Sequence, residues 1–122
     1  SMSKKGKKTN VSMDLLALLE LEMQASSERI LYLNLLRDAF EKEQVDHDLL
    51  EMLCDGMSLS NKMLREVEYV INSNPIVTPE GASSEQVVLF KEDQQILEAI
   101  ILTRSTLRQE MRRKKNISSF FH

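Results

Sequence analysis

Hydrophobic residues recur at intervals of three, four or seven along three segments of the chain. This spacing is typical of one face of an α-helix. The first stripe consists of Leu16, Leu19, Met23, Ile30, Leu33 and Phe40. A second face is marked by Leu15, Leu18, Leu31 and Leu35. We therefore predict a helix over residues 12–44 that packs on two partners, with Ser12 as its N-cap.

The second segment predicts a helix over residues 47–72 that begins after Asp46 as its N-cap. Its stripe, which keeps a seven-residue spacing with one polar slot, consists of Leu50, Leu53, Met57, Ser60, Leu64, Val67 and Ile71. Such spacing is typical of an antiparallel hairpin packed like a coiled coil. Two Pro and a Gly then predict a loop over residues 73–83.

The third segment predicts a helix over residues 84–116. Ser83 is followed three residues later by Gln86, the spacing of a capping box. The apolar stripe behind it consists of Phe90, Leu97, Ile100, Leu107 and Met111. The three stripes together predict an all-α fold, an elongated and mostly antiparallel three-helix bundle with coiled-coil-like packing. Only three Gly, two Pro and no Trp in 122 residues also argue against an all-β fold.

Charge divides the chain into an acidic body and basic ends. Residues 1–11 form a predicted flexible tail with four Lys and no acid, whereas residues 104–122 hold six bases and one acid. Phosphate binding needs positive potential over a contiguous face, so nucleic acid could contact only these ends. No segment approaches the roughly 20 apolar residues of a membrane span. We expect an intracellular protein, with the nucleus as an alternative suggested by the basic ends.

Catalytic and metal-binding signatures are missing from the sequence. There is no glycine-rich phosphate loop, nucleophile elbow or Glu-x-x-His pair. The single cysteine, Cys54, is expected to be a buried or half-buried thiol, and His47 lies between two Asp at a capped helix start rather than in a metal site. We therefore predict no enzyme activity, no metal and no cofactor.

The end of the chain, residues 117–122, is predicted to be a hydrophobic peptide. Ile117, Phe120 and Phe121 are the candidate partner-binding residues, because an aliphatic residue and two aromatics lie together after the helix. This pattern resembles the sliding-clamp interaction peptide, in which such a trio enters a hydrophobic pocket of the clamp. The motif carries Gln three positions before the aliphatic residue, where this chain has Lys114. The alternatives are that the three side chains fold back onto the bundle, bind another partner or form a self-association contact.

The size and helical pattern of the body also resemble the flagellar and type III export chaperones, which hold a partner helix in an apolar groove. The function predicted from the sequence is a protein-protein interaction module, an adaptor or assembly subunit. It would use a helical groove and the C-terminal peptide, with self-association into a homo-oligomer as one form of contact. The alternatives are a nucleic-acid-associated factor with basic ends and a clamp-binding peptide, or an export-type chaperone.

Overall fold

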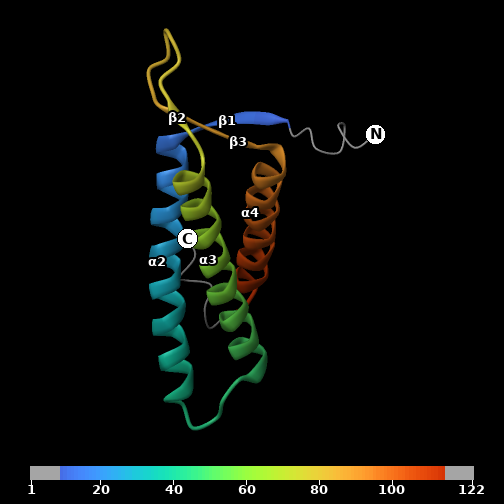
Figure 1. Ribbon diagram of the computed structural model, residues 1–122. Helices are drawn as coiled ribbons and strands as arrows, with labels where there is room; N and C mark the ends of the chain where they lie inside the picture. Colours follow the sequence, from blue (N-terminus) through green and yellow to red (C-terminus); the bar gives the residue numbers. More distant parts are fainter. Residues whose placement is uncertain (1–8, 115–122) are drawn as a thin grey trace, which may run out of the picture.

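A computed structural model describes residues 9–114 of the chain. Within them 71% of the residues are helical, in three long helices joined to a small sheet (Figure 1). The elements in chain order are β1 (Asn10–Asp14), α2 (Leu15–Phe40), α3 (His47–Ser73), β2 (Ile76–Val77), β3 (Gln86–Phe90) and α4 (Lys91–Arg112). The predicted helical bundle is confirmed, and its coiled-coil-like packing stays a prediction.

The helices α2 and α3 form an antiparallel hairpin, and α4 runs antiparallel to α3 beside it (Figure 1). Asp46 caps α3, because its Oδ1 accepts a hydrogen bond from the Leu49 backbone N–H at 3.1 Å. The cap confirms the predicted start of this helix, which ends one residue later than expected. The helix α4 is the shortest of the three, so the joined end of the hairpin extends beyond it (Figure 1).

The sheet corrects the prediction of an all-α fold. Its strand order is β1-β3-β2 with both pairings antiparallel, and Val11 pairs with Leu89 while Met13 pairs with Val87. Val87 and Leu89 are buried against the helices, so β3 contributes directly to the core. The sheet lies across the end of the bundle where α2 and α4 begin (Figure 1).

The strands also correct the predicted helix boundaries of 12–44 and 84–116. Ser12 lies in β1, and the N-cap of α2 is Asp14, whose Oδ1 accepts from the Leu16 N–H at 3.1 Å. Gln86 begins β3 instead of completing a capping box. The pairing of β1 with β3 satisfies the backbone groups that a longer helix would have satisfied internally. Consequently α2 starts at Leu15 and α4 at Lys91.

The buried apolar residues form two clusters along the bundle axis. The cluster nearer the sheet consists of Leu18, Ala25, Met63, Val67, Val70, Val87, Leu89 and Leu97. The cluster nearer the joined end of the hairpin consists of Tyr32, Leu35, Ala39, Leu49, Leu53, Leu107 and Met111. Each cluster takes residues from all three helices. The burial of such side chains is the main favourable term in the folding of a bundle this thin.

Candidate functional site

The helix α2 carries a second apolar face that faces away from the core. Its members, which are 40% to 70% exposed, are Leu16, Leu19, Met23, Ile30, Leu33 and Phe40. We call this set the α2 stripe. The sequence pattern assigned these residues to a face packed on a partner, but the residues that α2 buries in the core are Leu18, Ala25, Tyr32, Leu35 and Ala39. The stripe therefore does not hold the bundle together.

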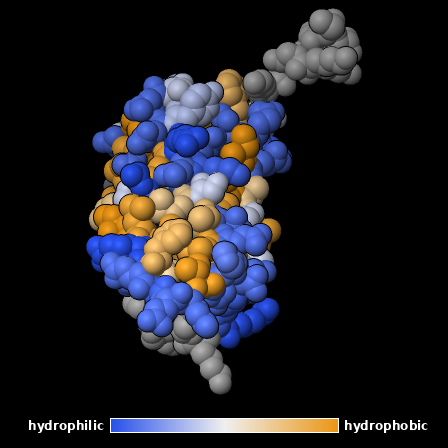
Figure 2. Space-filling view, turned by 90° about the horizontal axis from the view of Figure 1, so that it is seen from below, coloured by the Kyte–Doolittle hydropathy of each residue, from blue (hydrophilic) through white to orange (hydrophobic). Residues whose placement is uncertain are grey.

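The α2 stripe has the spacing of a coiled-coil seam. Its residues occupy six of the eight a and d positions between residues 16 and 40, and Ser26 and Arg37 occupy the other two. At 1.5 Å per residue the stripe is about 36 Å long. Viewed from the joined end of the hairpin, hydrophobic side chains reach the surface among hydrophilic ones (Figure 2). Phe40, at this end of the stripe, is 66% exposed.

Beside the α2 stripe, three charged residues join α2 to α4. Glu28 accepts hydrogen bonds from Arg104 Nε at 2.7 Å and Arg104 Nη2 at 2.6 Å, and from Arg108 Nη1 at 3.0 Å. The side chains of Glu28 and Arg104 are only 12% and 14% exposed, so water screens their attraction little. The hydrogen bonds that Arg104 donates to Glu28 raise the pKa of Arg104 above its usual value. These three residues, which we call the Glu28 cluster, join α4 to α2 through their side chains.

Tyr32 lies one helical turn after Glu28 and is 1% exposed. Burial raises the pKa of its hydroxyl to about 12, and the neighbouring charge of Glu28 acts in the same direction. The phenol is therefore neutral at physiological pH, which fits a core residue better than an acid-base catalyst.

The paired arginines bear on the nucleic-acid alternative. Arg104 and Arg108 are two of the six bases between residues 104 and 122. Both donate to Glu28 within the bundle, and Arg104 does so with two nitrogens. A guanidinium held by a carboxylate has fewer donors left for a phosphate.

A groove of about 490 Å³ lies between α3 and α4. Asp55, Lys62 and Glu110 give it charged walls, and Leu102, which is 69% exposed, is its most exposed apolar residue. The groove is open and combines charges of both signs. Of its apolar lining residues, Leu102 is the one that is mostly exposed.

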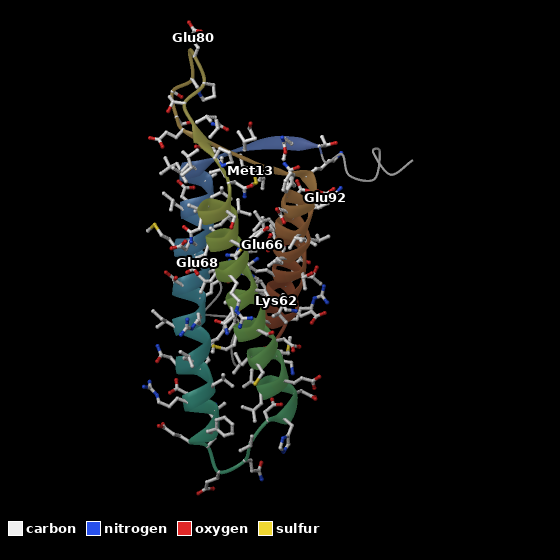
Figure 3. The ribbon with its side chains drawn as sticks, in the orientation of Figure 1. Met13, Lys62, Glu66, Glu68, Glu80 and Glu92 are labelled. Carbon is white, nitrogen blue, oxygen red and sulfur yellow. The ribbon has the colours of Figure 1, made fainter. Side chains whose placement is uncertain are left out.

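Glu66 is a carboxylate of α3 that lies close to α4 (Figure 3). Its Oε1 atom is buried and has no hydrogen-bond partner. Burial raises the pKa of Glu66, and the charge of Asp93 on α4 raises it further. A raised pKa is a common property of catalytic acids. Within residues 9–114, however, no three His, Cys, Asp or Glu side chains gather in a way that could hold a metal ion.

The remaining predicted site residues lie apart from these features. Ile117, Phe120 and Phe121 lie outside the described residues. Cys54 is exposed, which corrects the prediction of a buried or half-buried thiol, because the core-facing position of this turn is taken by Leu53. His47 lies in the first turn of α3, after the Asp46 cap, as expected.

Among residues 9–114 no helix has the length and apolar character needed to cross a membrane. Comparisons with known proteins give no match: no family model, no curated protein and no solved structure is significantly similar to the chain.

Proposed function

We propose that the protein is a non-enzymatic interaction module, an adaptor or assembly subunit, that binds a partner helix along the α2 stripe. The observation that carries this proposal is the exposure of six large apolar side chains at heptad spacing on one helix. Single exposed apolar residues are normal on a protein surface, whereas an aligned row of them marks an interaction site. A partner helix with the same spacing would insert its side chains between those of the stripe.

The energy available to such a complex follows from the exposed area. Full burial of a Leu, Ile, Met or Phe side chain contributes about 1.5–3 kcal/mol. About half of that remains available in the stripe, because its residues are 40% to 70% exposed. Six residues then contribute on the order of 6 kcal/mol, against an association cost of roughly 4–15 kcal/mol. The stripe alone supports a weak complex, and a tight one needs further contacts.

The C-terminal peptide is the second contact in this proposal. Ile117, Phe120 and Phe121 carry two aromatics, and aromatic anchors are common binding hot spots. The peptide follows α4 in the chain, and α4 is joined to α2 by the Glu28 cluster. A partner that binds the stripe and the peptide together gains from both sites without a second loss of translational freedom.

The test is capture of partners from cell extract by three forms of the full chain. Ile30→Asp places a charge on the α2 stripe, and Leu102→Asp makes the same change at an exposed apolar residue of α4. The third form lacks residues 116–122. We expect Ile30→Asp to lose the captured proteins and Leu102→Asp to keep them, while the truncated form captures less.

Several outcomes would redirect or end the proposal. If Leu102→Asp alone loses the partners, binding occurs in the groove between α3 and α4. If Ile30→Asp binds as the unaltered chain does, the stripe is not the site. If the captured material includes nucleic acid and is lost between about 50 and 200 mM salt, the basic ends are the binding site instead. Apolar packing along the α2 stripe responds little to salt.

A further inference from the structure

We propose that the partner helix on the α2 stripe is the α2 helix of a second copy of this chain, bound antiparallel. This inference rests on the proposed function, because it identifies the occupant of the same surface. The charges that flank the stripe favour this occupant. In coiled coils the residues at the e and g positions decide which helices pair and in which direction.

The flanking positions of the α2 stripe are unevenly charged. With Leu16 and Leu19 as the first a and d positions, Glu22 and Arg29 occupy consecutive g positions. The nearby e positions hold Glu20 and the uncharged Ser27. Arg29 is exposed and Glu22 is half-buried at the edge of the face. Glu22 and Arg29 occupy the same heptad position and carry opposite charges. Two copies of this helix therefore pair favourably only if Glu22 of one copy lies next to Arg29 of the other.

An antiparallel pair brings g positions of the two helices together. If the two-fold axis crosses the helix between residues 24 and 25, Glu22 of each copy faces Arg29 of the other. Two equivalent ion pairs then flank the contact. The apolar layers of this contact are Leu16 with Leu33, Leu19 with Ile30 and Met23 with Ser26, each occurring twice. The contact spans residues 16–33, about 27 Å of helix.

Shifting one helix by a heptad in either direction removes this complementarity. One shift places Glu22 against Glu22 of the second copy, and the other places Arg29 against Arg29. Like charges at such close positions are unfavourable. The charges therefore favour this antiparallel register over the two adjacent ones.

A parallel pair in register fails for two reasons. Arg37 occupies an a position, so it would face Arg37 of the second copy inside the apolar layers. Glu22 would face Ser27 and Arg29 would face Asn34, so neither charge would find its opposite. The antiparallel register leaves Arg37 beyond the contact, which ends at Leu33.

Charge reversal of the full chain tests the proposal by sedimentation equilibrium. Glu22→Arg and Arg29→Glu each turn two attractive contacts into two repulsive ones, and each should weaken dimerisation about ten-fold. The double variant with both changes restores opposite charges and should regain the dimerisation of the unaltered chain. Glu20→Arg is the matched control, because Glu20 faces Ser27 and not a charge; we expect a smaller effect.

The dimerisation of these variants separates three outcomes. A dimer weakened by both single changes and restored by the double change supports the antiparallel register. A dimer in which the two effects simply add overturns the register, since the residues then do not face each other. A chain that stays monomeric into the millimolar range overturns the second copy as occupant. In that case capture of partners lost by Ile30→Asp would still support the interaction module itself, so the two proposals fail separately.

Discussion

The aromatic ring of Tyr32 lies directly over Gly56: a Cβ atom built on Gly56 would lie 2.5 Å from Tyr32 Cζ and 2.7 Å from Cε1. Glycine inside a helix costs about 1 kcal/mol relative to alanine. Here the absence of a side chain lets α3 approach α2 closely enough to bury the whole tyrosine ring. The favourable burial of Tyr32 offsets the poor helix propensity of Gly56.

Gly56→Ala is therefore expected to destabilise the protein by about 1–3 kcal/mol, although alanine is the better helix former. The added methyl group has no space unless the ring or the helix moves. Denaturant unfolding measures the change. In a Tyr32→Leu background the same substitution should cost less, because the obstructing ring is gone; an equal cost in both backgrounds would show that the ring is not the cause.

Glu28→Gln is expected to lower the free energy of unfolding by on the order of 3 kcal/mol, because it leaves Arg104 and Arg108 without their carboxylate at a mostly buried site. The matched comparison is Asp38→Asn. Asp38 pairs with Arg37 at 3.8 Å, with both side chains more than half exposed. Such a surface pair contributes about 0–1 kcal/mol. Equal effects of the two substitutions would contradict a structural role for the Glu28 cluster.

Glu66→Gln is expected to stabilise the protein at neutral pH by up to about 1 kcal/mol, because it removes a partly buried charge whose Oε1 has no partner. Since burial raises the pKa of Glu66, the folded state binds the proton of this carboxyl more tightly than the unfolded state does. The stability linked to this proton is fully present below the unfolded pKa and is lost as pH rises through the higher folded pKa.

The stability gained by Glu66→Gln should therefore grow as pH rises above about 4.5, the ordinary pKa of a glutamate, and then level off above the raised pKa of the folded state. Melting curves at several pH values give the measurement. Glu68→Gln, at an exposed position of the same helix, is the control and should change little at any pH (Figure 3). A gain that is independent of pH would mean that the charge of Glu66 is not the cause.

The double substitution Phe120→Ala with Phe121→Ala is expected to cost on the order of 2–4 kcal/mol of partner binding and to leave the melting midpoint nearly unchanged. This outcome follows if Ile117, Phe120 and Phe121 insert into a partner. If they close the core of the bundle instead, each Phe→Ala should cost about 3–5 kcal/mol of stability. A large fall in the melting midpoint would therefore exclude the exposed peptide.

The sequence pattern predicted the helices well because each is long and strongly periodic. It failed to show which face of α2 is buried. Both Leu16-Leu19-Met23 and Leu18-Ala25-Tyr32 follow helical spacing, and periodicity gives the angle of a residue around the helix rather than its distance from the core. The contact of Gly56 with Tyr32 also joins two helices, so no local pattern contains it.

The sheet was missed for a related reason. β1 and β3 pair across more than 70 residues of chain, and each has only five residues. The run Gln86-Val87-Val88-Leu89-Phe90 is rich in residues that favour strands, which was the one local signal for β3. The Ser83 and Gln86 spacing suggested a capping box instead. Long-range pairing decided between the two structures, and the spacing of residues within one segment cannot show it.

Two leucines of α2 test most directly whether the α2 stripe is a binding surface. Leu33 is 45% exposed in the stripe, and Leu35 is 6% exposed in the core. Leu33→Ala and Leu35→Ala remove the same atoms two residues apart. Two quantities are measured for each variant. One is the free energy of unfolding at a concentration where the chain is monomeric, and the other is the affinity for the partner helix that binds the α2 stripe.

We expect Leu35→Ala to lose about 2–5 kcal/mol of stability, and Leu33→Ala to stay within about 0.5 kcal/mol of the unaltered chain while its binding weakens several-fold. If Leu33→Ala instead loses as much stability as Leu35→Ala, or keeps its full affinity, the outer face of α2 is not a binding surface.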